Sequence, residues 1–405
     1  MATARAVSVE IDSRARYHLT ITLPASGRAG RLLFLVALWP PSIFLAQAPQ
    51  TTAPPPSTSE LRLDTGKQIY EAACIGCHGP GGRGQPQTTL GFEPPATFPD
   101  FSDCPTSTPE RTFDWRATIH EGGRGRGFSE IMPSFAEALT VEQIDKVAKY
   151  LRTLCSEPDW PLGELNLPRP LITEKAFPET ETVLTIAANA NGAGALSSDF
   201  IYEQRFGVKN HFEFSVPVNF SEQGTGTWAG GVGDLAFGVK QVLAHSSRTG
   251  SIFSVQGEVS APTGNREKGL GSGVTTFEAF GAFGQILPHF SFFQIQAGVE
   301  LPTDTDKAPK AVFWRTALGR TFTQHQNFGR SWSPMVEILA DRDLETGADT
   351  NWDIVPEMQV TLNKRQHIRV NIGIRTPINN TAGRSTQVMV YALWDRFDGG
   401  LREGW

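Results

Sequence analysis

From residue 180 to residue 397 the chain alternates apolar and polar residues with a period of two. In residues 293–301 every odd position is apolar and every even position is polar or glycine, and residues 368–375 alternate in the same way. A period of two places alternate side chains on opposite faces of a β-strand. About a dozen such segments are separated by short turn sequences, and they lie near residues 182–190, 198–206, 208–220, 232–244, 251–261, 273–287, 289–302, 310–324, 332–342, 352–363, 366–376 and 385–397.

An even set of roughly ten-residue strands predicts an all-β antiparallel barrel of about 12 strands, with apolar side chains toward lipid and polar side chains toward the lumen. Tryptophans near the segment ends fit an interfacial girdle. A soluble β-sandwich has alternating strands too. We favour the barrel because the segments are long and one face carries Gln, Glu, Arg and Asn throughout. The tryptophans concerned are Trp228, Trp314, Trp332, Trp352 and Trp394.

Length and charge limit the classes of protein that remain. A chain of 405 residues predicts two or three domains. The 42 acidic residues outnumber the 36 Lys and Arg residues, so the net charge is −6, which argues against a nucleic-acid partner. Beyond the N-terminus no apolar run reaches the 18 or so residues of a membrane-spanning helix.

The N-terminal residues read as a targeting segment. Arg28 and Arg31 precede the apolar residues 32–45, and Ala46-Gln47-Ala48 follows. This order predicts a secretory signal peptide over residues 1–48, with an uncleaved anchor as the alternative. A Pro/Ser/Thr linker is expected over 49–59. The sequence then predicts a helical domain over 60–158, a Pro-rich hinge over 159–179 and the β-barrel over 180–398.

The most specific chemical motif is Cys74-Ile75-Gly76-Cys77-His78. Two thiols at this spacing can each add to a haem vinyl group, and the histidine that follows can ligate the iron. A dithiol redox pair is the rival interpretation, but it leaves His78 without a role. Residues 64–73 have a capping residue and helical spacing, so we expect a short helix leading into the motif.

A second axial ligand has few candidates. Met132 is the only methionine between residues 2 and 334, and Pro133 fixes the loop that carries it. A Met/His pair is the standard ligation of cytochromes c. Ligation by His120 and a five-coordinate iron are the alternatives.

Residues 61–155 resemble a class I monohaem cytochrome c, through the Cys74-to-His78 motif, the Met132-Pro133 loop and a final amphipathic helix at 140–152. The resemblance implies an all-α domain with one covalent haem c. Cys74 and Cys77 would form the thioethers, and His78 and Met132 would be the axial ligands of the iron.

Two further cysteines, Cys104 and Cys155, are expected to form a disulfide in an exported protein, with metal ligation or a reactive thiol as alternatives. Two Gly-rich loops carry Arg83, Arg124 and Arg126. Their guanidinium groups could pair with haem propionates or with an acidic redox partner. Solvated loop arginines are the plainer alternative.

Neither half shows a hydrolytic triad, a nucleotide fingerprint or a paired-carboxylate site, so the sequence predicts an electron carrier and not an enzyme, with direct oxidation of a metal ion left open.

The domain order is similar to that of cytochrome-porin fusions such as the outer-membrane iron oxidases. We expect a barrel in the outer membrane, in contact with its lipid, and a cytochrome domain in the periplasm that exchanges electrons with periplasmic redox proteins. A small solute or ferrous iron could enter through the barrel. The alternatives are a solute channel with a cytochrome as sensor or docking module, and a redox subunit of a periplasmic dehydrogenase with a soluble β-domain.

Overall fold

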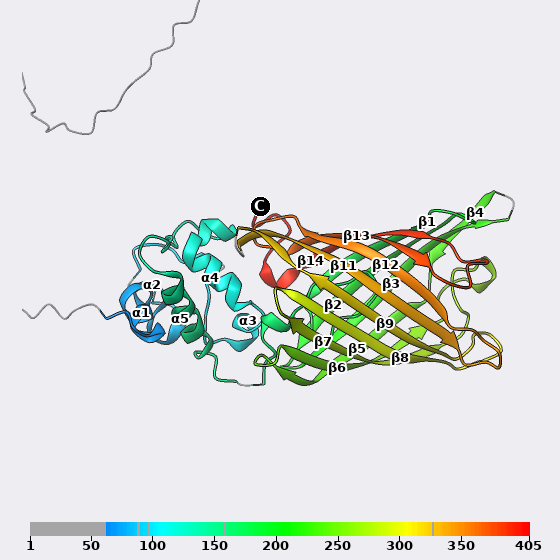
Figure 1. Cartoon of the computed structure of the whole chain (residues 1–405), viewed down its shortest axis with the longest axis horizontal. Helices are drawn as coiled ribbons and strands as arrows, with labels where there is room; N and C mark the ends of the chain where they lie inside the picture. Colours follow the sequence, from blue (N-terminus) through cyan, green and yellow to red (C-terminus); the bar gives the residue numbers. More distant parts are fainter. Residues whose placement is uncertain (1–61, 87–89, 96–97, 158, 225, 326–327) are drawn as a thin grey trace, which may run out of the picture. The chain divides into compact units, whose positions relative to one another are not determined.

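The computed structural model describes residues 62–86, 90–95, 98–157, 159–224, 226–325 and 328–405. The signal peptide and the linker predicted over residues 1–59 lie outside this part of the chain. Helices form the first described region and strands form the second (Figure 1). Among the described helices, none is both long enough and apolar enough to cross a membrane.

Two capped helices frame the helical region. Thr65 and Gln68 form a reciprocal capping box at the start of α1 (Gly66–Ala73), and Thr140 does the same with Gln143 at the start of α5 (Val141–Arg152). Such a box satisfies backbone N–H groups that a helix start leaves unpaired. The shorter elements are α2 (Ile75–His78), η1 (Pro80–Gly82), α3 (Cys104–Ser107), α4 (Thr112–Glu121), η2 (Gly123–Arg126) and η3 (Gly163–Leu165).

α1 and α5 pack directly against each other around a buried core. Their apolar faces contribute Ile69 and Tyr70 from α1 and Ile144, Val147 and Leu151 from α5. The two helices can approach closely because α1 begins with a glycine. A Cβ atom on Gly66 would lie 2.0 Å from the carbonyl oxygen of Lys146 in α5. The spacing of these residues in the sequence predicted the apolar face of α5.

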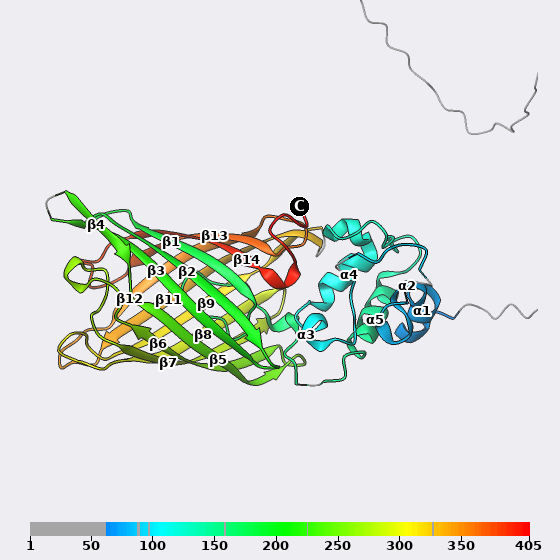
Figure 2. The ribbon, with the colours of Figure 1, turned by 180° about the vertical axis from the view of Figure 1, so that it is seen from behind.

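Twelve antiparallel strands close into a barrel, as expected (Figures 1 and 2). β1 pairs with β14 and β9 pairs with β11, so the wall has no free edge. Two short strands, β4 (Thr227–Val232) and β10 (Phe322–His325), lengthen hairpins at its rims. The wall strands are β1 (Glu181–Asn189), β2 (Ala195–Phe206), β3 (Asn210–Gln223), β5 (Leu235–Ser246), β6 (Ser251–Ala261), β7 (Thr276–Leu287), β8 (Ser291–Pro302), β9 (Ala311–Arg320), β11 (Phe328–Asp343), β12 (Asn351–Thr361), β13 (Ile368–Pro377) and β14 (Gln387–Asp395).

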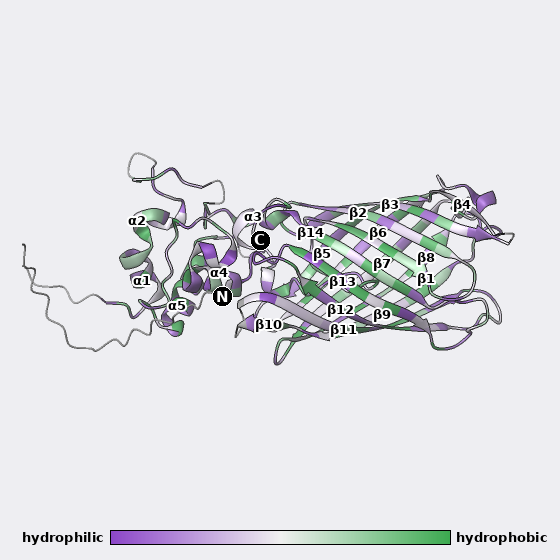
Figure 3. Cartoon of the chain, turned by 90° about the horizontal axis from the view of Figure 1, so that it is seen from above, coloured by the Kyte–Doolittle hydropathy of each residue, from purple (hydrophilic) through white to green (hydrophobic). Residues whose placement is uncertain are grey.

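The two faces of the wall differ in polarity as the alternation predicted. Figure 3 shows hydrophobic and hydrophilic residues alternating along the strands. In β3 Phe214 is 39% exposed, whereas Glu213 next to it is 6% exposed. The outer face therefore carries apolar side chains, and the inner face carries the buried polar side chains together with apolar ones such as Phe280 and Phe313. Outward apolar residues include Phe200, Phe237, Val239, Phe277, Leu318, Ile372 and Ile374.

The two ends of the barrel differ in the length of their connections. Short turns at residues 207–209, 247–250, 288–290 and 362–367 join strands at one end. At the other end the connections are longer, and the longest single one spans residues 262–275. β1 starts at the short-turn end, where Glu181 pairs with Asp395.

The Pro-rich residues before β1, expected to be a hinge, lie inside the barrel. Leu165, Thr173, Lys175 and Phe177 are each 2% exposed or less. Their hydrogen bonds run to side chains of the wall, among them Glu337 of β11. The sequence alone did not predict this location.

Candidate functional site

Four of the predicted site residues line one cavity in the helical region. Cys74, Cys77, His78 and Met132 all border a space of about 440 Å³. A cavity of this size falls in the range that proteins use for small molecules and cofactors. The structure therefore brings together residues 54 positions apart in the sequence.

The attachment motif forms one turn of helix at the end of α1. Cys74 ends α1, and its carbonyl oxygen accepts the backbone N–H groups of Cys77 at 3.2 Å and His78 at 2.9 Å. Both thiols are free. This turn brings the two thiols and the imidazole to the same cavity.

Apolar side chains make up most of the remaining wall. The imidazole of His78 stacks on Phe98, with ring centroids 5.0 Å apart. An apolar wall excludes water and lowers the local dielectric constant. The aromatic residues that border the cavity are Tyr70, Phe92, Phe98, Phe101, Trp115, Phe128, Phe135 and Phe397.

Burial sets the protonation states of His78 and Cys74. It lowers the pKa of His78 to about 4, so the imidazole is neutral near pH 7. A neutral imidazole has a lone pair for a metal ion. Burial, together with the neighbouring Cys77, raises the pKa of Cys74 to about 11. In the described residues, the buried Nδ1 atom of His78 has no hydrogen-bond partner.

Tyr70 holds the chain that follows the motif. Its hydroxyl group donates to the carbonyl oxygen of Gly79 at 2.6 Å. Gly79 has φ +70°, a conformation that L side chains rarely adopt. The chain can therefore turn sharply after His78. Burial raises the pKa of Tyr70 to about 12, so its hydroxyl group keeps its proton.

The Met132 loop is held by the second Gly-rich segment. Gly123 donates its N–H to the carbonyl oxygen of Met132 at 3.1 Å. A Cβ atom on Gly123 would lie 2.1 Å from the carbonyl oxygen of Ser129, and one on Gly122 would lie 2.9 Å from that of Met132. These glycines therefore allow the close approach that positions Met132. The sequence alone did not predict this contact.

His120, the alternative ligand, does not border the cavity. Its Nδ1 atom lies 2.7 Å from a carboxylate oxygen of Glu121. Arg83 and Arg124 are exposed, and they interact with Ser102 and Glu130. None of these three side chains borders the cavity.

Arg126 differs from the other two predicted arginines because it is only 2% exposed. It pairs with Asp114 inside the protein. Burial alone would raise the pKa of Asp114, but Arg111 and Arg126 outweigh it and lower this pKa to about 2. Arg126 is therefore neither a surface contact for a partner nor part of the cavity wall.

The same cluster of charges joins the helical region to the short-turn end of the barrel. Arg126 donates to the carbonyl oxygen of Arg365 at 3.2 Å, and Arg365 donates to that of Gly127 at 2.6 Å. Burial and the nearby Asp398 raise the pKa of Glu110 well above its usual value. The cavity itself includes Phe397 to Gly399, which follow the last strand. Sequence patterns gave no sign of these long-range contacts.

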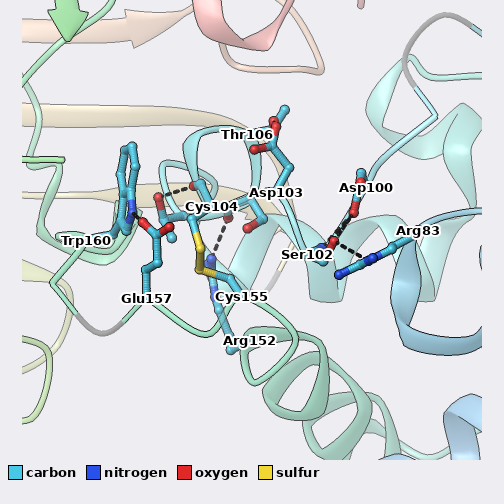
Figure 4. Close-up of a disulfide and its surroundings, with 12 residues drawn as sticks. Arg83, Asp100, Ser102, Asp103, Cys104, Thr106, Arg152, Cys155, Glu157 and Trp160 are labelled. Carbon is cyan, nitrogen blue, oxygen red and sulfur yellow. Dashed lines mark hydrogen bonds between the residues drawn. A yellow bond between two sulfur atoms is a disulfide. The ribbon is translucent and has the colours of Figure 1, made fainter. Parts of the chain in front are cut away.

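Cys104 and Cys155 form a disulfide, with an S–S distance of 1.96 Å (Figure 4). It links α3 to the segment after α5. Arg152, near the end of α5, donates to the carbonyl oxygen of Ser107 at 2.7 Å, and its guanidinium group lies 4.0 Å from the ring centroid of Trp115. Trp115 borders the cavity, so these contacts support its wall.

Residues 63–155 match the model of the family described as cytochrome c. This segment is a cytochrome c domain. Cytochrome c domains carry a covalently bound haem c, and the cavity described above fits that group: it has two thiols, a neutral imidazole and a thioether within an aromatic wall. The chain is a cytochrome c domain fused to a closed barrel.

Among the solved structures similar to this chain are an outer-membrane channel and two porins. An outer-membrane channel from Pseudomonas putida F1 is 14% identical, with a TM-score of 0.39, and the match covers 56% of this chain and 99% of that one. The NanC porin is 9% identical with a TM-score of 0.37, covering 53% and 99%. The KdgM porin in complex with disordered oligogalacturonate is 6% identical with a TM-score of 0.35, covering 53% and 98%. None of the curated proteins matches the sequence.

The described residues also hold one group of metal-ligand type inside the barrel. Ligand atoms of Glu203, His211 and Glu213 lie within 4.8 Å of one another. His211 Nδ1 accepts the backbone N–H of Glu179 at 2.9 Å, so a neutral imidazole carries its proton on Nε2. Arg169 already donates to both carboxylate oxygens of Glu203. This arrangement leaves no imidazole lone pair for a metal ion.

Proposed function

We propose that this protein is an electron carrier with a single haem c, anchored in the outer membrane by its barrel. The observation that carries the proposal is the convergence of two thiols, one imidazole and one thioether on a single apolar cavity. Cys74 and Cys77 would hold the haem through thioether bonds. His78 and Met132 would be the axial ligands of the iron.

When bound, haem c supplies an iron centre that accepts and releases one electron. The protein's own residues bind and orient it. The neutral imidazole of His78 offers its lone pair, and the loop held by Gly122 and Gly123 brings the Met132 thioether to the cavity. The aromatic wall excludes water, and a low-dielectric site with a Met ligand favours a raised reduction potential.

The outer face of the barrel supports a location in a membrane. Large apolar side chains such as Phe214, Phe237 and Ile372 face outward along the strands, each 39% exposed or more. Carboxylate, amide and guanidinium groups face inward. A closed wall that is apolar outside and polar inside is what a transmembrane barrel requires.

The unequal connections support an orientation in that membrane. Outer-membrane barrels have short periplasmic turns and longer extracellular loops. In this chain β1 starts at the short-turn end, next to the end of β14. The proposed cytochrome domain, which precedes β1, would then lie in the periplasm. Periplasmic redox proteins are the partners that such a position allows.

Surface charge offers a contact for such a partner. The side chain of Arg124 is 80% exposed and lies 3.5 Å from Glu130, the residue before the exposed Ile131, which borders the cavity. Arg83 is exposed as well. An acidic redox partner would be attracted to these guanidinium groups, and this attraction would weaken as salt is added.

Membrane fractionation with haem staining tests the proposal. We expect a haem-positive band of this protein in the outer-membrane fraction, and loss of the stained band but not of the protein when Cys74 and Cys77 are both changed to Ala. The purified protein should be reduced by a one-electron donor and reoxidised by a one-electron acceptor, one electron for each haem. Haem staining that stays in the soluble fraction would contradict the membrane anchor, and staining of the double variant would contradict the attachment site.

A further inference from the structure

Residues 163–179 lie inside the barrel at the short-turn end, where Asn166, Leu167 and Phe177 border a remaining cavity of about 490 Å³. Leu165, Ala176 and Phe177 pack in one apolar cluster with side chains of the strands β5, β6, β7 and β9. Leu171 packs in another cluster with residues of β1, β11, β12 and β14. The segment is thus in apolar contact with opposite parts of the wall.

The middle of this segment is bound through its backbone. The N–H groups of Ile172 and Thr173 both donate to the carboxylate of Glu337 on β11, at 3.0 and 2.6 Å. The N–H group of Leu171 donates to Glu357 on β12 at 2.9 Å. Three consecutive backbone N–H groups therefore donate to buried carboxylates of the wall. These hydrogen bonds fix the position of the segment along the barrel axis.

The charges of the segment are paired with charges of the wall. Arg169 is 5% exposed and its Nη1 atom lies 2.8 Å from Glu181 of β1 and 2.9 Å from Glu203 of β2. Lys175, 1% exposed, lies 3.4 Å from Glu181. A buried ion that loses its partner is strongly unfavourable. Arg169 therefore compensates buried carboxylates of the wall, and Lys175 pairs both with the wall and, at 2.5 Å, with Glu179 of the segment itself.

Glycines of the wall make room for leucines of the segment. A Cβ atom on Gly373 of β13 would lie 2.5 Å from a methyl group of Leu171. A Cβ atom on Gly284 of β7 would lie 3.1 Å from a methyl group of Leu167. The wall is therefore complementary to this segment in shape as well as in charge.

Every one of the twelve wall strands contributes a residue to these contacts, and the full set closes a ring around the segment. Of the strands not yet named, β3 binds through His211 and β8 through Gln294. The contacting residues, one for each strand, are Glu181, Glu203, His211, Lys240, Ile252, Phe280, Gln294, Phe313, Glu337, Glu357, Asn371 and Tyr391.

We infer that residues 163–179 are a resident plug that closes the barrel to solutes. The cytochrome domain would then be separated from the external medium, and neither a small solute nor ferrous iron would reach it through the lumen. The closed state is built into the wall, because carboxylates, glycines and apolar side chains of the strands are all used to hold the plug. This inference concerns the barrel alone and does not depend on the haem.

Conductance measurements on the purified full-length protein in planar phosphatidylcholine bilayers test the plug. We expect no ion current above that of the lipid alone. Replacing residues 163–179 by a Gly/Ser sequence of equal length should give stable current steps, and Glu337→Ala should give intermittent ones. Glu345→Ala, in the loop between β11 and β12, is the matched control and should stay silent. Steady current through the unaltered protein, or none through a replacement variant that keeps its β-sheet circular dichroism, would overturn the inference.

Thiol labelling gives a second measurement, which does not require a variant with a destabilised plug. Thr173→Cys, at a position 1% exposed, should resist a maleimide polyethylene glycol reagent in the native protein and react after denaturation. Thr381→Cys, on an exposed loop, should react in the native protein. The parent chain, with its four cysteines, gives the background. Rapid native labelling at position 173 would show that the segment leaves the lumen and would overturn the plug.

Discussion

Replacing Gly66 by alanine should destabilise the cytochrome domain by acting on the contact between α1 and α5. The added Cβ atom would lie 2.0 Å from the carbonyl oxygen and 2.7 Å from the carbonyl carbon of Lys146, and 2.8 Å from Cβ of Tyr150. Two of these three atoms belong to the backbone of a hydrogen-bonded helix, which cannot move as a side-chain end can. The two helices must therefore separate for alanine to fit.

The expected cost follows from two opposing effects. Inserting a methyl group into a packed contact costs roughly 1–3 kcal/mol, and occasionally more. Alanine favours a helix interior over glycine by about 1 kcal/mol, but less at the first position of a helix. A net loss of about 2 kcal/mol would lower the melting temperature of a domain of this size by roughly 10 °C.

Thermal unfolding of the full-length protein in detergent, followed through the haem absorbance band, measures this shift. Gly91→Ala is the matched control, because a Cβ atom there would meet nothing within 4 Å. The control should melt with the parent protein. Equal melting temperatures for Gly66→Ala and Gly91→Ala would refute the close packing of α1 on α5.

Three further predictions concern the same domain. Met132→Ala should abolish the low-spin absorbance features of Met ligation while covalent haem is retained, and an unaltered spectrum would exclude Met132 as ligand. Changing Cys104 and Cys155 together to Ser should lower the free energy of unfolding by about 4 kcal/mol, which the chain-entropy model gives for a sequence separation of 51. The parent protein, unfolded under non-reducing conditions, is the reference for this measurement. The Asp114 pKa of about 2, below its ordinary 3.8, should contribute about 2 kcal/mol of stability above pH 4, lost as the pH falls toward 2. Asp114→Asn should remove that part of the pH dependence in urea titrations, and a variant with the parent's acid profile would contradict the pairing with Arg126.

Local patterns carried the sequence-based predictions that succeeded. The spacing of Cys74, Cys77 and His78 lies within one helical turn, so chain connectivity alone places these residues together. The alternation in residues 293–301 shows which side chains face the inside of the barrel and which face outward. It also limits the register in which neighbouring strands can pair. The barrel and its approximate strand number could therefore be predicted before any long-range contact was known.

The plug could not be predicted in this way. Residues 163–179 have no period of two and no helical period, and Pro168, Pro170 and Pro178 make them read as a hinge. Their partners come from strands up to 222 residues away, as with Tyr391 and the carbonyl oxygen of Arg169. The burial of Arg126 could not be predicted either, since its contacts include the carbonyl oxygen of Arg365, 239 positions away.

The residues that follow β14 serve two parts of the structure at once. Phe397 to Gly399 border the cavity of the cytochrome c domain, and they follow the strand that pairs with β1 to close the barrel. The strand pair that closes the barrel therefore also fixes the position of one side of the cavity.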